Sequence, residues 1–202
     1  MYMRCTIVTI IIFFGTLLPA RSQPEVHRYR IDLAGARIGT MTVSRETLPD
    51  KQVRYTQTSD VQVNLLVYKL KVYYQVVSLF KQGQLMLATV DAHSNQDTYR
   101  SRTEWTGNQY TISARQYKYE RTVTENRKID FTVAMLYFSE PIGRQQVYAE
   151  YFGDYFRLTP TPRPSYRAQL ADREDEYCYE RGKLVRVIKK NSVKNFTLRL
   201  LE

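Results

Sequence analysis

The sequence has few of the residues that most often carry catalysis or bind metal ions. Its 202 residues include two histidines, His27 and His93, and two cysteines, Cys5 and Cys178. A protein metal site usually takes three or four ligands, and no Cys-x-x-Cys pair is present to start one. The Gly-x-Ser-x-Gly elbow of serine hydrolases is missing as well. We therefore expect no metal and no cofactor, and we favour a non-enzymatic protein while leaving activity open.

The sequence also lacks an apolar run long enough to cross a membrane as a helix. Residues 6–18 are continuously apolar, but this is about 13 residues where a spanning helix needs about 20. The run follows the short basic segment 1–4, and Ala20-Arg21-Ser22 supplies small residues for cleavage, which is typical of an export signal. We expect residues 1–22 to be removed and the mature chain, without a transmembrane span, to be periplasmic or secreted.

Cleavage would leave Cys178 as the last cysteine, which excludes an internal disulfide. Lipid acylation is disfavoured because Cys5 lies at the start of the apolar run and not at the cleavage site. We expect Cys178 to be a small buried side chain in a strand. Residues 23–202 are enough for a single domain that buries about 70% of its unfolded surface without disulfides or metal.

Acidic residues are outnumbered: the chain has 30 Lys and Arg against 20 Asp and Glu. Removing Arg4 and Arg21 leaves 28 against 20, a net charge of +8. Exported proteins rarely meet nucleic acid, so we expect envelope lipids or glycans as partners and no nucleic acid. The basic residues are spread along the chain, and a solvated sheet face explains them equally well.

No stretch shows a convincing apolar stripe at helical spacing, and apolar and polar residues alternate instead. Tyr29, Ile31 and Leu33 would share one face of a strand, and tight turns such as Lys81-Gln82-Gly83-Gln84 recur at strand-length intervals. The pattern predicts an all-β fold, a single antiparallel meander of about 10 to 13 strands. A sheet of that size curls into a barrel, half-barrel or sandwich.

Two short segments allow specific structural predictions. The apolar positions change parity at Leu65-Leu66 without Gly, Pro or Asp, which predicts a bulge or bend inside one long strand. The charged residues 172–176 are expected to form a turn.

Glu140 and Glu150 are the best candidates for catalytic residues. Two nearby carboxylates can serve as acid and base, or as nucleophile, at a glycosidic bond. They support an alternative function as an envelope polysaccharide hydrolase. The competing structural explanation for Glu140 is an ordinary hydrogen bond or an ion pair with Arg144.

Aromatic residues are abundant, with 17 tyrosines in the chain. Cross-strand packing explains tyrosines in a sheet. The functional hypothesis is an aromatic-lined cavity or platform for a lipid-like, amphipathic or glycan ligand, with Lys69, Lys71 or Arg144 at its mouth. An interaction module that binds through a strand edge is a further alternative. The candidate ligand-binding residues are Trp105, Tyr137, Arg144, Tyr148, Tyr151, Tyr155, Tyr177 and Tyr179.

The segment Leu136-Tyr137-Phe138-Ser139-Glu140-Pro141, with Gly143, Glu150 and Phe152-Gly153 after it, resembles a family of exported bacterial proteins, the domain of unknown function 6134. The resemblance covers most of the mature chain and implies an exported all-β protein, without implying an activity. It would also place a shorter turn containing glycine at residues 172–176. Further matching segments are Tyr29-x-Ile31, Ile38-Gly39, Phe80-x-x-Gly83-x-Leu85, Thr103-x-Trp105-x-Gly107, Tyr110-x-Ile112 and Tyr177-x-Tyr179-x-x-Gly182-x-Leu184.

Overall fold

The computed structural model describes residues 23–65, 68–95, 97–116, 119–190 and 195–201, which form an all-β structure as predicted. Fourteen strands are described, slightly more than expected, together with a short 3-10 helix, η1 (Val133–Tyr137). The predicted export signal lies outside the described residues. The strands are β1 (Glu25–Leu33), β2 (Ala36–Thr47), β3 (Val53–Leu65), β4 (Tyr68–Lys81), β5 (Gln84–Ser94), β6 (Thr98–Trp105), β7 (Tyr110–Gln116), β8 (Tyr119–Glu125), β9 (Gln146–Ala149), β10 (Asp154–Pro160), β11 (Ser165–Leu170), β12 (Arg173–Glu180), β13 (Lys183–Lys190) and β14 (Phe196–Leu201).

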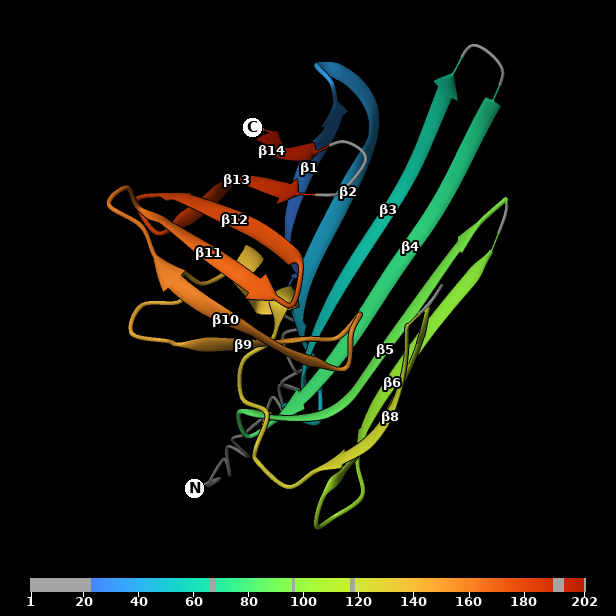
Figure 1. The fold of residues 1–202 in the computed structure, drawn as a ribbon. Helices are drawn as coiled ribbons and strands as arrows, with labels where there is room; N and C mark the ends of the chain where they lie inside the picture. Colours follow the sequence, from blue (N-terminus) through green and yellow to red (C-terminus); the bar gives the residue numbers. More distant parts are fainter. Residues whose placement is uncertain (1–22, 66–67, 96, 117–118, 191–194, 202) are drawn as a thin grey trace, which may run out of the picture.

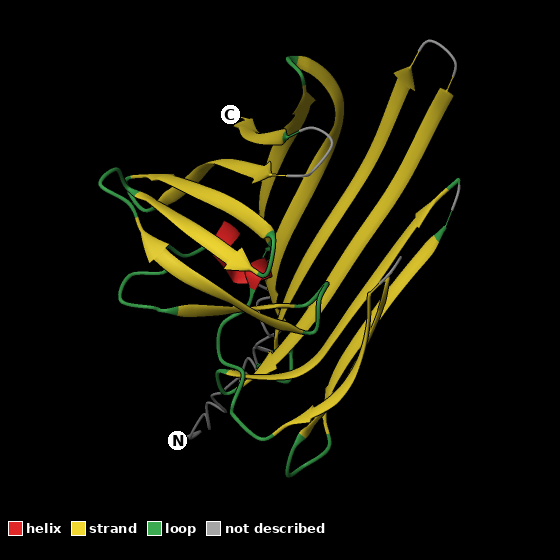
Figure 2. Cartoon of the chain, viewed as in Figure 1, coloured by secondary structure: helices red, strands yellow, loops and turns green. Residues whose placement is uncertain are grey.

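All fourteen strands belong to one antiparallel sheet with the order β8-β7-β6-β5-β4-β3-β2-β1-β14-β13-β12-β11-β10-β9. Consecutive strands pair with each other except β8 and β9, and β1 pairs with β14 as well as with β2, which joins the two halves of the chain. The long strands β1 to β8 form a curved half, and β9 to β13 lie across its concave side, with η1 between them (Figures 1 and 2). The edge strands β8 and β9 do not pair with each other within the described part of the chain, so the sheet is curled but not closed.

The core lies between the two halves of the sheet, where the alternating side chains point inward. Tyr29 and Ile31 are 0% and 4% exposed, as their spacing predicts. Residues from β1 and β2 pack there against η1 and against the inner faces of β9 to β14. Cys178 is buried too, as expected for a small apolar side chain.

The predicted turn at Lys81-Gln82-Gly83-Gln84 is confirmed. Lys81 pairs with Gln84, so Gln82 and Gly83 alone connect β4 to β5. Their φ angles are +50° and +70°. Two consecutive residues with positive φ match the twist of a hairpin, and glycine adopts this conformation without steric cost.

The prediction of one long strand through Leu65-Leu66 is wrong. β3 and β4 pair antiparallel as far as Leu65 and Tyr68, so the chain reverses here; Leu66 itself lies outside the described residues. Directly paired residues share a face, and Val61 pairs with Val72. The change of parity therefore places the apolar side chains of both strands on the same face of the sheet.

The prediction of a turn over residues 172–176 is also wrong. The turn is confined to Ala171, with φ +51°, and Asp172, and β12 begins at Arg173. Paired strands supply cations to the acidic residues: Lys189 lies 2.7 Å from Asp175, and Arg167 lies 3.3 Å from Glu174. Cross-strand charge pairing thus allows an acidic run to form a strand.

Candidate functional site

Four of the predicted ligand-binding tyrosines lie in the core and are at most 2% exposed. The hydroxyl of Tyr179 donates to the carbonyl oxygen of Leu136 at 2.8 Å, and the hydroxyls of Tyr148 and Thr103 are 2.6 Å apart. Burial raises the pKa of all four tyrosines, so they stay neutral. These contacts are typical of side chains that pack the core. The four are Tyr137, Tyr148, Tyr177 and Tyr179.

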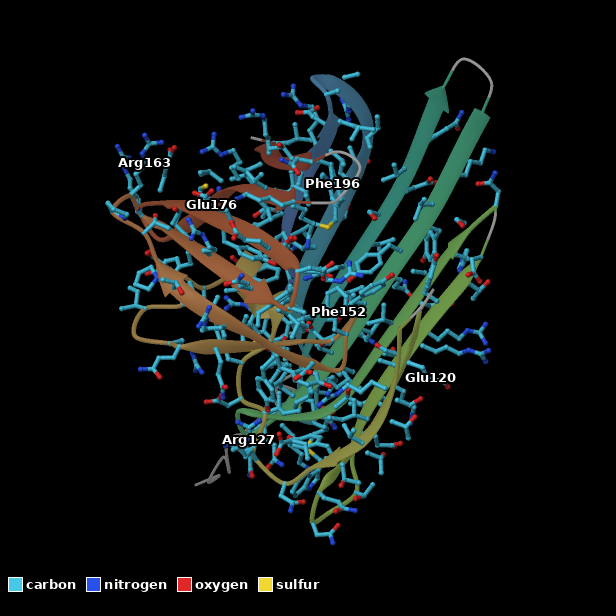
Figure 3. The ribbon with its side chains drawn as sticks, in the orientation of Figure 1. Glu120, Arg127, Phe152, Arg163, Glu176 and Phe196 are labelled. Carbon is cyan, nitrogen blue, oxygen red and sulfur yellow. The ribbon has the colours of Figure 1, made fainter. Side chains whose placement is uncertain are left out.

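Trp105 and Tyr155 belong to a second aromatic group, around the buried Tyr110 and Tyr148. The Trp105 and Tyr110 rings are 4.8 Å apart, and the Tyr148 and Tyr155 rings are 5.2 Å apart. Arg127 lies 4.7 Å from the centre of the Tyr155 ring. Burial is the main cause that raises the pKa of Tyr155 to about 12. Figure 3 places Arg127 at the lower end of the molecule, away from the labelled Phe152.

Arg144 and Glu140 have different partners: they do not form an ion pair with each other, and Glu140 makes an ordinary hydrogen bond instead. Arg144 pairs with Asp130 at 3.1 Å and lies over the ring of Phe131, 4.2 Å from its centre. Glu140 accepts a hydrogen bond from the hydroxyl of Tyr166 at 2.9 Å. Both residues therefore have structural partners on the β9 to β13 side of the molecule.

Glu150 is a buried carboxyl group with 3% of its surface exposed. Its Oε1 accepts hydrogen bonds from the hydroxyl of Ser78 at 3.1 Å and from the backbone N–H of Ala134 at 3.2 Å. Burial raises the pKa of Glu150, and these hydrogen bonds lower it in part. No hydrogen bond or ion pair joins it to Glu140 within the described residues, so the two candidate acids occupy separate surroundings.

A group of partly exposed aromatic rings lies beside Glu150, and we call it the aromatic rim: Tyr74, Tyr99, Tyr151 and Phe152. The ring centres of Tyr74 and Tyr151 are 5.9 Å apart, and those of Tyr151 and Phe152 are 5.0 Å apart. Tyr99 shares the face of Tyr74, because both pair with Ala92 of β5. The rim thus joins β4 and β6 to the segment after β9.

Charged groups from β12 and β13 lie next to this rim. The Arg173 guanidinium is 4.7 Å from the centre of the Phe152 ring. Lys189 pairs with Asp175 at 2.7 Å, and the negative charge of Asp175 helps to raise the pKa of Tyr74, after the larger effect of burial. Burial raises the pKa of Tyr151 to about 12. The rim therefore combines neutral aromatic surface with nearby cations.

The segment that carries Tyr151 and Phe152 is held in a tight turn after β9. The backbone N–H groups of Phe152 and Gly153 both donate to the carbonyl oxygen of Ala149, at 3.0 and 2.9 Å. Figure 3 shows Phe152 on the side of β9 to β13 that faces β4. Tyr151 is among the binding residues predicted from the sequence, whereas Tyr74, Tyr99, Phe152 and Arg173 are not. The alternation of residues along each strand places Tyr74 and Tyr99 on the inner face of the sheet. Only the pairing of β4 and β6 with β5 places them together beside the turn after β9.

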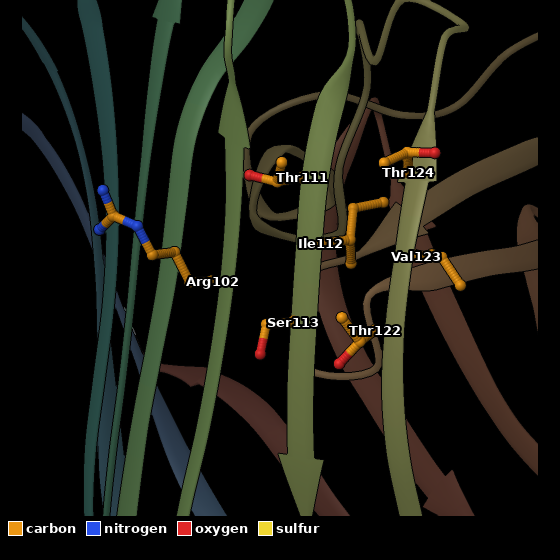
Figure 4. A pocket seen from close by; sticks show the side chains of 7 residues that line it. All are labelled: Arg102, Thr111, Ile112, Ser113, Thr122, Val123 and Thr124. Carbon is orange, nitrogen blue, oxygen red and sulfur yellow. The ribbon is translucent and has the colours of Figure 1, made fainter.

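A separate surface pocket of about 450 Å³ lies on β6, β7 and β8. Hydroxyl groups of Thr111, Ser113, Thr122 and Thr124 line it together with Arg102 (Figure 4). It contains none of the residues predicted from the sequence, and its threonine and serine side chains face outward from the edge of the sheet.

Neither the aromatic rim nor the surface pocket on β6, β7 and β8 has a cluster of metal ligands among the described residues. Across the described ranges, no group of three or more His, Cys, Asp or Glu side chains could hold a metal ion. The same residues include no helix with the length and apolar character needed to cross a membrane.

The curled, unclosed sheet defines an all-β, barrel-like protein whose rim carries aromatic and basic side chains. Residues 29–201 match the family described as "Domain of unknown function (DUF6134)", and the chain belongs to this family, as its motifs predicted. The fold is similar to the crystal structure of a beta-barrel-like protein of domain of unknown function DUF1849 from Brucella abortus. The TM-score is 0.56 over 90% of this chain and 97% of that chain, and at 9% identity the likeness shows the fold alone. No curated protein matches the sequence.

Proposed function

We propose that the protein is an exported, non-enzymatic binder of an amphipathic ligand with an apolar chain and an anionic head group. The apolar part would lie on the aromatic rim, and the head group would lie by Arg173. The observation that carries the proposal is the position of Arg173 over the ring of Phe152, beside three partly exposed tyrosines. Within the described residues Arg173 has no acidic side chain at ion-pair distance.

The rim suits the apolar part of such a ligand. Ligand sites in proteins are lined mostly by apolar and aromatic side chains with a few polar groups that fix orientation. Tyr74, Tyr99 and Tyr151 lie with Phe152 on the concave side of the sheet, where a chain can contact several rings at once. The hydroxyls of Tyr74 and Tyr151 stay neutral because burial raises the pKa of both, so they do not repel an acidic ligand.

The charge at the rim suits an acidic head group. A guanidinium with no carboxylate partner can bind a carboxylate or phosphate through two parallel hydrogen bonds. Lys189 adds a second cation nearby, although Asp175 offsets it. The predicted export signal supports a place at the cell envelope, where lipids with acidic head groups are abundant.

The test is a titration of the mature protein into a fluorescent fatty acid and into its uncharged methyl ester. Saturable binding of the fatty acid is expected. Phe152→Ala should weaken the binding of both probes about tenfold, since it removes about 1.4 kcal/mol of contact energy. Arg173→Gln should weaken the binding of the acid and leave the ester almost unchanged.

Tyr73→Ala is the matched control. Tyr73 and Tyr74 are adjacent on β4 and point to opposite faces, and Tyr73 stacks on His93 on the outer face at 4.8 Å. The control should bind both probes as the parent protein does. The proposal fails if the parent binds neither probe, or if Tyr73→Ala and Phe152→Ala reduce binding equally while circular dichroism shows that both are folded.

A further inference from the structure

Three arginines lie side by side on the outer face of the sheet, and we call them the arginine row: Arg30, Arg199 and Arg186. Arg30 of β1 pairs directly with Arg199 of β14, and Arg199 pairs directly with Arg186 of β13. Their chain neighbours Tyr29, Leu198 and Val187 are buried, so the arginines point away from the core. The row therefore lies on the face opposite the aromatic rim.

The positive charge of the row is only partly offset. Asp32 contacts two of its members, with Oδ2 at 3.0 Å from Nε of Arg30 and 3.6 Å from Nε of Arg199. Like charges directly opposite each other destabilise a sheet, and one carboxylate cannot balance three guanidinium groups. Arg28, two residues before Arg30 on the same strand face, adds a further exposed cation.

Arg186, the third member of the row, has the least support from hydrogen-bond acceptors around it. Nε of Arg186 is buried, and no acceptor in the described part of the chain bonds to it. Its Nη2 contacts the sulfur of Cys178 at 3.6 Å, which is a weak acceptor. On the paired strand β12, Oε1 of Glu176 accepts from the hydroxyl of Ser165 at 3.0 Å, and no ion pair joins Glu176 to Arg186 within the described residues. Buried polar groups are normally paired, whereas Nε of this guanidinium has no acceptor among the described residues.

We propose that the arginine row binds a phosphate group. Neighbouring strands are about 4.8 Å apart, so three guanidinium groups in register can surround one tetrahedral anion. Each guanidinium presents parallel N–H donors that match two oxygens of a phosphate. The phosphate can be free or part of a lipid head group, and the experiment below separates these two sources.

The first experiment is a titration of the isotope-labelled mature protein with inorganic phosphate at constant ionic strength, observed by NMR through the arginine Nε–Hε signals. Saturable shifts are expected at Arg30, Arg199 and Arg186. Arg199→Gln should weaken the binding about tenfold. Arg115→Gln is the control, because Arg115 is an exposed arginine on the outer face of β7 and its loss changes the net charge equally.

The second experiment is sedimentation of the mature protein with vesicles of phosphatidylglycerol or of phosphatidylcholine. Binding to phosphatidylglycerol that Arg199→Gln abolishes and Arg115→Gln preserves identifies a lipid head group. Phosphate binding at the row without vesicle binding identifies a free phosphate group. The proposal is overturned if phosphate leaves the three signals unshifted, or if Arg115 shifts as much as they do. These outcomes are independent of the fatty-acid titration at the aromatic rim.

Discussion

The backbone of Gly153, in the turn after β9, packs directly against Ile112 of β7. A Cβ atom at position 153 would lie 2.6 Å from Cγ2 of Ile112 and 3.3 Å from Cβ of Ala114. The φ of Gly153 is +62°, a backbone conformation that residues with a side chain rarely adopt. This contact joins the turn that carries Phe152 to the opposite half of the curved sheet.

Gly153→Ala should therefore lower the free energy of unfolding by about 2 to 4 kcal/mol, from backbone strain and overpacking together. Urea unfolding followed by Trp105 fluorescence measures the change. Gly143→Ala is the control, because Gly143 has φ +73° but no atom within 4 Å of the added Cβ. Gly143→Ala should lower the free energy of unfolding only through backbone strain, by about 1 to 2 kcal/mol. Equal losses in the two variants would contradict the packing explanation.

Glu150→Gln should change how stability depends on pH. Burial raises the pKa of Glu150 above its ordinary 4.5, so the folded state holds this proton more tightly than the unfolded state. The resulting stabilisation is complete below pH 4.5 and is lost as the pH rises through the raised pKa, at up to about 1.4 kcal/mol per pH unit. Glutamine does not ionise and its oxygen can still accept from Ser78. Urea unfolding between pH 4 and pH 8 should show this loss of stability in the parent protein and not in Glu150→Gln. The same pH dependence in both proteins would refute this role of Glu150.

Tyr148→Phe should lower the free energy of unfolding by about 1 to 2 kcal/mol. The substitution leaves the hydroxyl of Thr103, which is 1% exposed, without its partner at 2.6 Å. Tyr166→Phe removes a hydroxyl that bonds to Glu140 in a partly exposed place, where water can replace it. Thermal unfolding should thus shift less for Tyr166→Phe, and the reverse order would count against the burial argument.

Lys189→Met should destabilise the protein by about 1 to 3 kcal/mol, because it leaves the buried carboxylate of Asp175 without its cation. Adding Asp175→Asn to this variant should recover part of the loss, since the buried charge is then gone. A double-mutant cycle in urea measures the coupling. Lys183→Met, an exposed lysine at the start of the same strand, should have little effect. A coupling near zero would show that water already screens the pair.

Much of the strand pattern could be predicted because it depends on short stretches of chain. Gln82 and Gly83 form the predicted hairpin turn, and Tyr29 and Ile31 lie on the predicted inner face. The end of β3 at Leu65 was missed because no Gly, Pro or Asp marks it in the sequence. The run at 172–176 was misjudged because its cations come from other strands, with Lys189 pairing to Asp175.

The candidate sites were less accessible to prediction. Tyr177 and Tyr179 stood out as aromatic residues, yet both are packed in the core. Phe152 and Arg173 became notable only once the structure placed one over the other. In the same way, Arg186 and Arg199 are unremarkable until the strands that carry them are aligned.

By itself the sequence determined the all-β class, the period of two that assigns faces to each strand, and the family motifs, because these depend on neighbouring residues. Only the tertiary structure decided that β1 pairs with β14, that the sheet curls without closing, and which side chains meet across it. Those features depend on pairings between residues far apart in the chain, such as Arg30 with Arg199. Local sequence carries no record of register between distant strands, since many pairings would bury the same apolar faces equally well.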